Sequence, residues 1–146
     1  MIVGKRKEYN NYKWECATSI EAHTSPVLCL KNDRNLLISS ANRSIRMWDL
    51  ADNKLVSEIV NQNLNTFVKS ITICNEKRML VAACDKVVTL WDLRTSSNEG
   101  VLRGHKEEVR CLHIANNYLF TAGKGLSNSG SLIIWDIRFL NSANPL

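Results

Sequence analysis

Short apolar runs of about five residues recur along this chain in groups of three, separated by Asn, Asp, Lys, Gly or Ser. Some runs alternate apolar and polar positions, as Ser44 to Met47 do, which is the period of a half-buried strand. Others, such as Met79 to Ala83, are apolar on both faces, which is typical of strands sandwiched between neighbouring sheets. No stretch shows a 3.6-residue apolar period, so the sequence predicts an all-β fold with almost no helix. The runs cover residues 27–30, 36–40 and 44–49; 68–73, 79–84 and 87–92; and 109–114, 118–122 and 131–136.

Each group of runs ends in a Trp-Asp pair, and the pairs recur about every 44 residues, which is the length of one four-stranded propeller blade. A further β-rich segment accompanies each group and predicts one outer strand per blade; these segments are Tyr12 to Ile20, Lys54 to Val60 and Glu99 to Leu102. The sequence therefore predicts about three four-stranded blades. Because propellers typically close with about four to eight blades, we expect an incomplete or fragmentary ring.

These residues resemble the WD40-repeat family over roughly residues 12–138, because Gly-His, strand, turn and Trp-Asp recur in order. The resemblance implies an N-terminal arm over 1–11, repeats over about 12–49, 54–92 and 98–136, and a C-terminal tail over 139–146.

The resemblance also implies that each blade is held by a hydrogen-bonded His, Ser or Thr, turn Asp and Trp. No unit is complete. Asn42 replaces the Asp in the first, Leu64 or Asn65 replaces the His in the second, and the third lacks the Asp in a lengthened turn over 123–130. The structural blade residues expected on this basis are His23, Asn42, Trp48 and Asp49; Asp85, Trp91 and Asp92; and His105, Trp135 and Asp136.

Composition adds limits on the compartment and on the partners. The 45% hydrophobic and 23% charged content is that of an ordinary globular protein. The net charge of +5 is scattered apart from Lys5-Arg6-Lys7, without the basic stripe and interleaved aromatics that nucleic-acid binding uses. No signal segment or apolar run near 18 residues is present, so we expect no membrane partner. Five cysteines without a C-x-x-C pair favour a reducing compartment, cytoplasmic or nuclear.

One pair of residues raises the question of catalysis. Cys111 and His113 lie two apart on a predicted strand and would face the same side, as in a Cys–His dyad or half of a zinc site. No second ligand pair accompanies them, and Gly123-Lys124-Gly125 leads into a strand, not into a helix N-terminus that could hold phosphate. We therefore expect no catalytic, cofactor-binding or metal-binding residues.

An Arg follows two of the three Trp-Asp pairs at the same place, at Arg94 and Arg138, whereas Ala51 follows the first. At the end of the strand, the planar guanidinium of each Arg can pair with carboxylates or carbonyls of a partner. Alternatively, each Arg pairs with its own neighbouring blade. The tandem resembles the Trp-Asp-x-Arg motif of WD40 receptors that dock on the propeller adaptor of cullin–RING ligases. The short turns between the first two strands of each group resemble those of F-box and TRAF-type WD40 proteins.

The sequence thus predicts a non-catalytic protein-interaction scaffold or adaptor, with substrate recognition in a ubiquitin-ligase complex as the more specific hypothesis. One alternative is a fragment of a larger enzyme, a RING-type ligase or a protein kinase, whose catalytic domain lies outside this chain. Another is a regulatory propeller in cytoskeletal, trafficking or nuclear assemblies. We also expect self-association or additional blades to close the ring, because an open ring leaves strand edges unpaired.

Overall fold

The computed structural model describes residues 8–9, 12–13, 15–60 and 66–139 of the chain. Within these residues it consists of three antiparallel sheets and a small hairpin of β1 (Glu8–Tyr9) and β2 (Tyr12–Lys13). The single helical element there is a 3₁₀ turn over Leu126–Asn128, so the all-β prediction is confirmed. In this part of the chain no helix is long and apolar enough to cross a membrane.

Each sheet is a meander whose strands pair in chain order. The first sheet contains β3 (Cys29–Asp33), β4 (Leu36–Ala41), β5 (Ser44–Asp49) and β6 (Lys54–Val60). The second contains β7 (Val68–Cys74), β8 (Met79–Cys84), β9 (Val87–Asp92) and β10 (Asn98–Arg103). The third contains β11 (Val109–Ala115), β12 (Tyr118–Lys124) and β13 (Gly130–Asp136). All eleven strands overlap runs that the sequence predicts, although β3 shares only Cys29 and Leu30 with its predicted run.

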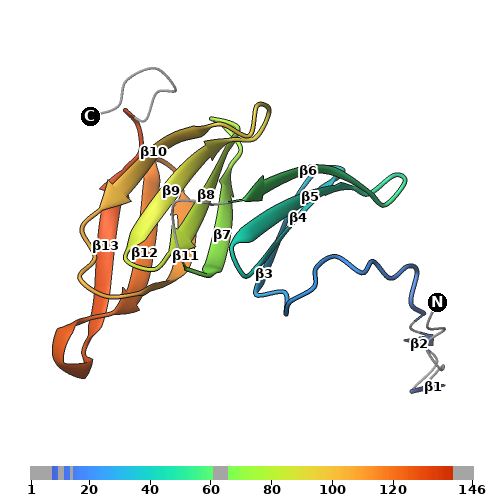
Figure 1. Ribbon diagram of the computed structural model, residues 1–146, viewed down its shortest axis with the longest axis horizontal. Coiled ribbons are helices and arrows are strands. Elements are labelled where there is room, and N and C mark those ends of the chain that lie inside the picture. Colours follow the sequence, from blue (N-terminus) through green and yellow to red (C-terminus); the bar gives the residue numbers. More distant parts are fainter. Residues whose placement is uncertain (1–7, 10–11, 14, 61–65, 140–146) are drawn as a thin grey trace.

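The three sheets follow one another along an open arc, as Figure 1 shows. The first strand of each sheet lies on the inside, where β7 contacts both β3 and β11. This is the arrangement of successive propeller blades, in which each unit packs only on its neighbours.

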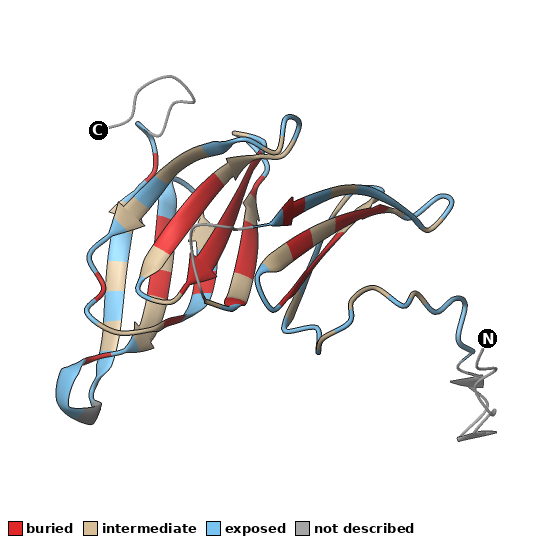
Figure 2. Cartoon of the chain, viewed as in Figure 1, coloured by how far each residue is buried: buried red, intermediate tan, exposed pale blue. Residues whose placement is uncertain are grey.

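Two apolar cores lie between the sheets, one on each side of the second (Figure 2). Every residue of β8 is buried because its side chains alternate between them. Leu80, Ala82 and Cys84 enter the core shared with the first sheet, whereas Met79, Val81 and Ala83 enter the core shared with the third. The run that is apolar on both faces is therefore the central strand of the arc.

The outer strand predicted over Tyr12 to Ile20 is wrong for most of its length. Only Tyr12–Lys13 is a strand, paired with β1, and residues 15–28 form none. The third sheet consequently has three strands among the described residues, where four were predicted. The reason is spatial, because the free edge at β13 lies at the other end of the arc (Figure 1). Several predicted features lie outside the described residues, namely Lys5-Arg6-Lys7, Leu64, Asn65 and most of the predicted arm and tail.

Candidate protein-interaction site

A hydrogen-bonded set surrounds the tryptophan of the third sheet. Trp135 Nε1 donates to Thr121 Oγ1 at 2.9 Å, and the same oxygen lies 2.6 Å from His105 Nε2. On the other side of the imidazole, Ser131 Oγ lies 3.3 Å from His105 Nδ1. Gly104 packs closely here, because a Cβ on it would lie 3.0 Å from Trp135 Cη2. The Gly-His pair is thus fixed by the ring that ends the same repeat.

The first sheet repeats this set with different residues. Trp48 Nε1 donates to Ser39 Oγ at 2.9 Å, and Ser39 Oγ lies 2.7 Å from His23 Nε2. Ser44 Oγ approaches His23 Nδ1 at 3.5 Å. A serine at the start of the third strand, not the turn residue Asn42, therefore faces the imidazole in this sheet as in the third.

Both imidazoles favour the neutral form. Desolvation lowers the pKa of His105, although its hydrogen bond to Thr121 opposes the shift. Desolvation, followed by the positive charge of Arg46, lowers the pKa of His23. A neutral imidazole offers one donor and one acceptor nitrogen, which suits a ring placed between two hydroxyls. Each histidine therefore ties the segment before its sheet to two strands of that sheet.

In the second sheet a different residue accepts the hydrogen bond from the tryptophan, which was not predicted from the sequence. Ala82 stands where Ser39 and Thr121 stand in the other sheets, so β8 supplies no hydroxyl. Thr89 on β9 takes its place: Trp91 Nε1 donates to Thr89 Oγ1 at 2.9 Å, and Thr89 Oγ1 donates to the Ala82 carbonyl at 3.3 Å. Because Ala82 and Thr89 are ladder partners, the hydroxyl has moved across one strand pair. The signal was a Thr two residues before the Trp, found in no other repeat.

Asn42 and Asp85 occupy equivalent left-handed turns, with φ of 50° and 54°. Their carbonyls accept hydrogen bonds from the backbone N–H of Val68 and Val109, each at 2.7 Å. Each turn therefore links its own sheet to the next one. The sequence assigned these residues a side-chain role, and the structure places their backbone at the junctions.

The aspartates of the three Trp-Asp pairs shape the turns that come after them. In each case a carboxylate oxygen accepts the backbone N–H two residues later: Ala51 to Asp49 at 2.7 Å, Arg94 to Asp92 at 2.7 Å and Arg138 to Asp136 at 3.0 Å. The bond from the Thr95 N–H is the largest cause of the lowered pKa of Asp92, and the Arg138 side chain is the largest cause for Asp136. Ionised carboxylates thus hold the backbone of both candidate arginines.

Arg94 and Arg138 are exposed at the same end of neighbouring sheets, where β9 and β13 finish. We name this end, with the loops after β7, β9, β11 and β13, the Arg rim. The Arg138 guanidinium binds Asp136, with Nε 3.0 Å from each carboxylate oxygen, and lies 5.6 Å from the ring centroid of Phe139. Lys77 Nζ reaches from the loop after β7 to the Arg138 carbonyl at 3.0 Å.

The alternative that each Arg pairs with a neighbouring sheet does not describe Arg138, because its carboxylate partner belongs to its own strand. An exposed ion pair between residues two apart contributes little to stability because water screens it. Such a pair orients the Arg138 guanidinium but leaves it able to exchange Asp136 for another carboxylate. A partner's carboxylate could therefore replace Asp136 at small cost.

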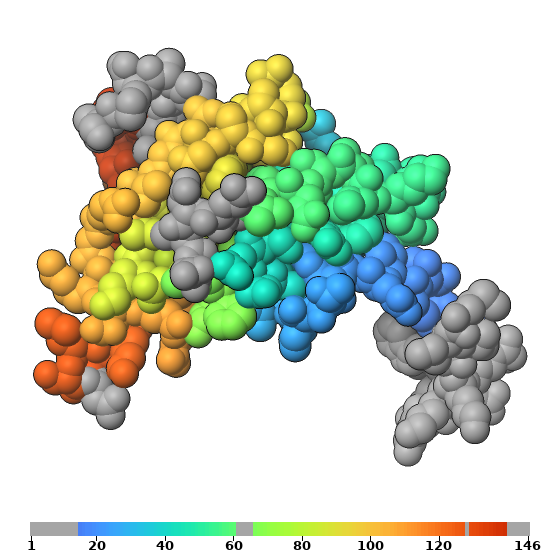
Figure 3. Space-filling model, in the orientation of Figure 1, coloured from blue at the N-terminus to red at the C-terminus, as the bar shows by residue number. Residues whose placement is uncertain are grey.

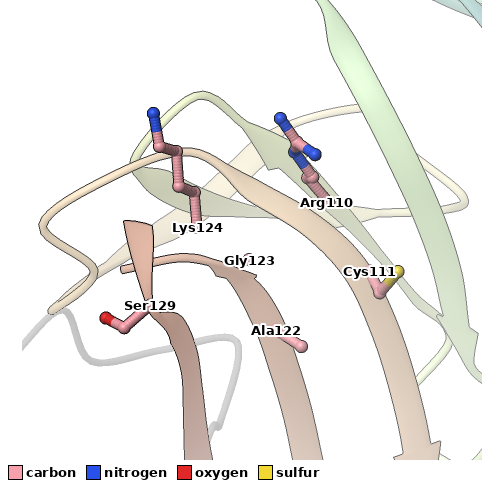
Figure 4. Close-up of a pocket in the computed structure, with 6 residues that line it drawn as sticks. All are labelled: Arg110, Cys111, Ala122, Gly123, Lys124 and Ser129. Atoms are coloured by element: carbon pink, nitrogen blue, oxygen red, sulfur yellow. The ribbon is translucent and has the colours of Figure 1, made fainter. Parts of the chain in front are cut away.

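A second feature lies on the outer face of the third sheet, away from the Arg rim. A hollow of about 530 Å³ is lined by Arg110, Cys111, Ala122, Gly123, Lys124 and Ser129 (Figure 4). Cys111 is exposed there. Over residues 8–139, apart from the undescribed positions, no three His, Cys, Asp or Glu side chains gather as a metal site would need. The sequence singled out Cys111, Gly123 and Lys124, which line the hollow, but it did not predict that they come together.

Comparison with known proteins identifies a family model that matches two segments of the chain. The family model described as "WD domain, G-beta repeat" matches residues 14–49 and 96–136, just over half of the chain. No curated protein matches the sequence.

Solved structures match the fold. The computationally designed Ika4 protein is similar with a TM-score of 0.69 at 21% identity, covering 82% of this chain and 71% of that protein. The designed Ika8 protein is similar with a TM-score of 0.69 at 20% identity, covering 92% and 46%. The WD40 repeats of RRP9 are similar with a TM-score of 0.67 at 17% identity, covering 80% and 37%. The chain thus spans less than half the length of the last two.

Proposed function

Because this chain belongs to the WD40-repeat family, whose propellers generally bind other proteins, we propose that it is a non-catalytic scaffold that binds a protein partner through the Arg rim. The observation that carries the proposal is the repeated turn after Trp-Asp, which presents Arg94 and Arg138 in the same way on adjacent sheets. A surface built from rigid strands and fixed turns is pre-organised, which lowers the entropic cost of binding.

The chemistry of this rim favours an acidic partner surface. Arg94, Arg138, Lys77 and Arg78 supply four cations there. A guanidinium donates paired N–H hydrogen bonds to carboxylates or carbonyls, and Arg is enriched among residues that dominate interface energies. Asp92 and Asp136 are ionised at neutral pH, and their lowered pKa values keep them ionised under more acidic conditions too, so the turns stay formed.

The specific partner that we propose is the propeller adaptor of cullin–RING ligases, with this chain acting in substrate recognition. Two of the three repeats carry Trp-Asp-x-Arg, and both arginines are exposed on the Arg rim, at the same end of their strands. This proposal rests on the motif and on its placement.

The test replaces both arginines with alanine and measures binding of the 146-residue chain to the purified adaptor. If each Arg is an interface hot spot worth about 2 kcal/mol, each replacement weakens Kd about thirtyfold. The melting temperature should not change, since both side chains are exposed. Arg43→Ala is the matched control, because Arg43 is exposed in the turn between β4 and β5, at the opposite end of the strands. Equal adaptor binding by the double variant and the wild-type chain would refute the proposal.

A further inference from the structure

The junction between the second and third sheets shows what a complete contact between neighbours contains. The far face of a sheet is the one that points to the next sheet, and the near face is the one that points to the previous sheet. Val88 and Leu90 on the far face of the second sheet pack with Val109 and Leu112 on the near face of the third. The N–H of Val109 also donates to the Asp85 carbonyl at 2.7 Å, and Lys69 pairs with Glu108.

The far face of the third sheet has the same apolar character but no neighbour among the described residues. Leu132 and Ile134 of β13 hold the ladder positions that Val88 and Leu90 hold in β9. Their exposed fractions are 65% and 56%, against 0% and 2% for the two buried equivalents. A face that is buried at one junction is therefore open at the end of the arc.

The near face of the first sheet is the complement of this open face. Val27 lies two residues before Cys29, as Val68 and Val109 lie two residues before Ser70 and Cys111 at the ladder positions equivalent to Cys29. Val68 and Val109 are 1% and 0% exposed, whereas Val27 is 43% exposed. The same valine recurs in three repeats and is buried only where a preceding sheet exists.

The hollow on the third sheet lies where that valine would bind. Its lining residues Cys111, Ala122 and Gly123 correspond to Ser70, Ala83 and Cys84 by ladder register. In the second sheet this region faces Val109, whose N–H bonds the Asp85 carbonyl directly after Cys84. The hollow of about 530 Å³ therefore lies at the position that Val109 covers on the second sheet.

The molecule also contains an unpaired strand edge and a segment that could pair with such an edge. Among the described residues β13 has no partner on its outer side, so an edge of N–H and C=O groups is open there. The segment 16–21 precedes His23 as β10 precedes His105, which is the place of an outer strand, yet it belongs to no sheet. These two elements lie at opposite ends of the molecule (Figures 1 and 3), so they cannot pair within one copy.

We propose that two copies of this chain bind head to tail, with the near face of the first sheet of each copy on the far face of the third sheet of the other. Val27 enters the hollow, and residues 16–21 add an outer strand to β13. A contact between two different faces closes into a ring when its rotation fits. Two copies supply six sheets, within the range of about four to eight blades in closed propellers.

The experiment is sedimentation equilibrium of the 146-residue chain and of three variants. The wild-type chain is expected to be a dimer at micromolar concentration. Val27→Asp and Ile134→Asp each place a charge on one of the two faces and should each give a monomer. Val27 and Ile134 are 43% and 56% exposed in a single copy, so circular dichroism should show unchanged folding. Leu30→Asp replaces Val27→Asp if the latter fails to fold. Phe67→Asp is the matched control at 55% exposure, between the first two sheets, and should remain a dimer.

Mixing the two monomeric variants tests the head-to-tail geometry. The Val27→Asp copy keeps an intact far face and the Ile134→Asp copy keeps an intact near face, so an equimolar mixture restores one junction and forms a heterodimer. A contact between identical faces predicts instead that one of the two variants dimerises alone. A monomeric wild-type chain, a dimeric Val27→Asp variant, a mixture without heterodimer, or open polymers of the wild-type chain would each overturn the two-copy ring.

Discussion

Replacing Thr89 with valine should destabilise the second sheet, because this buried hydroxyl serves the tryptophan that β8 cannot serve. The change removes the acceptor of the Trp91 indole N–H and the bond from Thr89 to the Ala82 carbonyl. A buried donor left without a partner costs about 1–3 kcal/mol. Trp91 is only half-buried, so we expect a loss of about 1.5 kcal/mol in the free energy of unfolding.

The assay is urea unfolding followed by tryptophan fluorescence. With a urea dependence of about 1.5 kcal/mol per molar, the midpoint should fall by about 1 M. Adding Ala82→Ser to Thr89→Val returns a hydroxyl to β8, where Ser39 and Thr121 carry theirs, and should recover at least half of the loss.

Thr72→Val makes the same chemical change at another buried threonine, outside the tryptophan sets, and should shift the midpoint much less. An unchanged midpoint for Thr89→Val, or no recovery in the double variant, would refute the idea that the hydroxyl has moved across the ladder.

Three further changes test other parts of the fold. A Cβ on Gly123 would lie 2.0 Å from the Glu108 carbonyl oxygen, so Gly123→Ala should lower the unfolding free energy by about 3 kcal/mol; Gly130→Ala, with open space around it, should leave it within about 0.5 kcal/mol. Burial lowers the pKa of His105 below its ordinary 6.5, so the unfolded chain binds protons first. The free energy of unfolding should therefore be highest above pH 6.5 and should fall as the pH drops below 6.5. Urea titrations at several pH values measure this, and His105→Gln should weaken the dependence. Arg78 has a φ of 52°, which glycine adopts more easily, so Arg78→Gly should raise the thermal midpoint by a few degrees; a lowered midpoint would show that the side chain stabilises its turn.

The strands were predictable because their signal is local. Apolar alternation and the Trp-Asp period depend on residues close in sequence, and β6, β8 and β9 have the predicted bounds. The outer strand before His23 could not be predicted in the same way, since a strand forms only where an edge lies beside it. Residues 15–20 have no such edge in one copy.

Predicting the side-chain roles would have required the pairing register of the strands as well as the spacing of residues along the sequence. The exchange between Ala82 and Thr89 is visible only when they are known to be ladder partners. Ser44 and Ser131, which face the imidazoles, begin or nearly begin a strand and looked like ordinary polar positions. The partner-binding role of Arg94 and Arg138 stays a prediction, although both are exposed on the Arg rim.

The complete burial of β8 has a consequence for how the molecule opens. In a single copy the three sheets form a linear array in which each unit is stabilised only by its neighbours, so the ends loosen before the middle. β8 is the one strand of the described sheets with every residue buried, and both apolar cores must separate before its amides meet solvent. Its amide protons should therefore exchange most slowly and report the global unfolding free energy, while those of β3 and β13 report partial opening from either end.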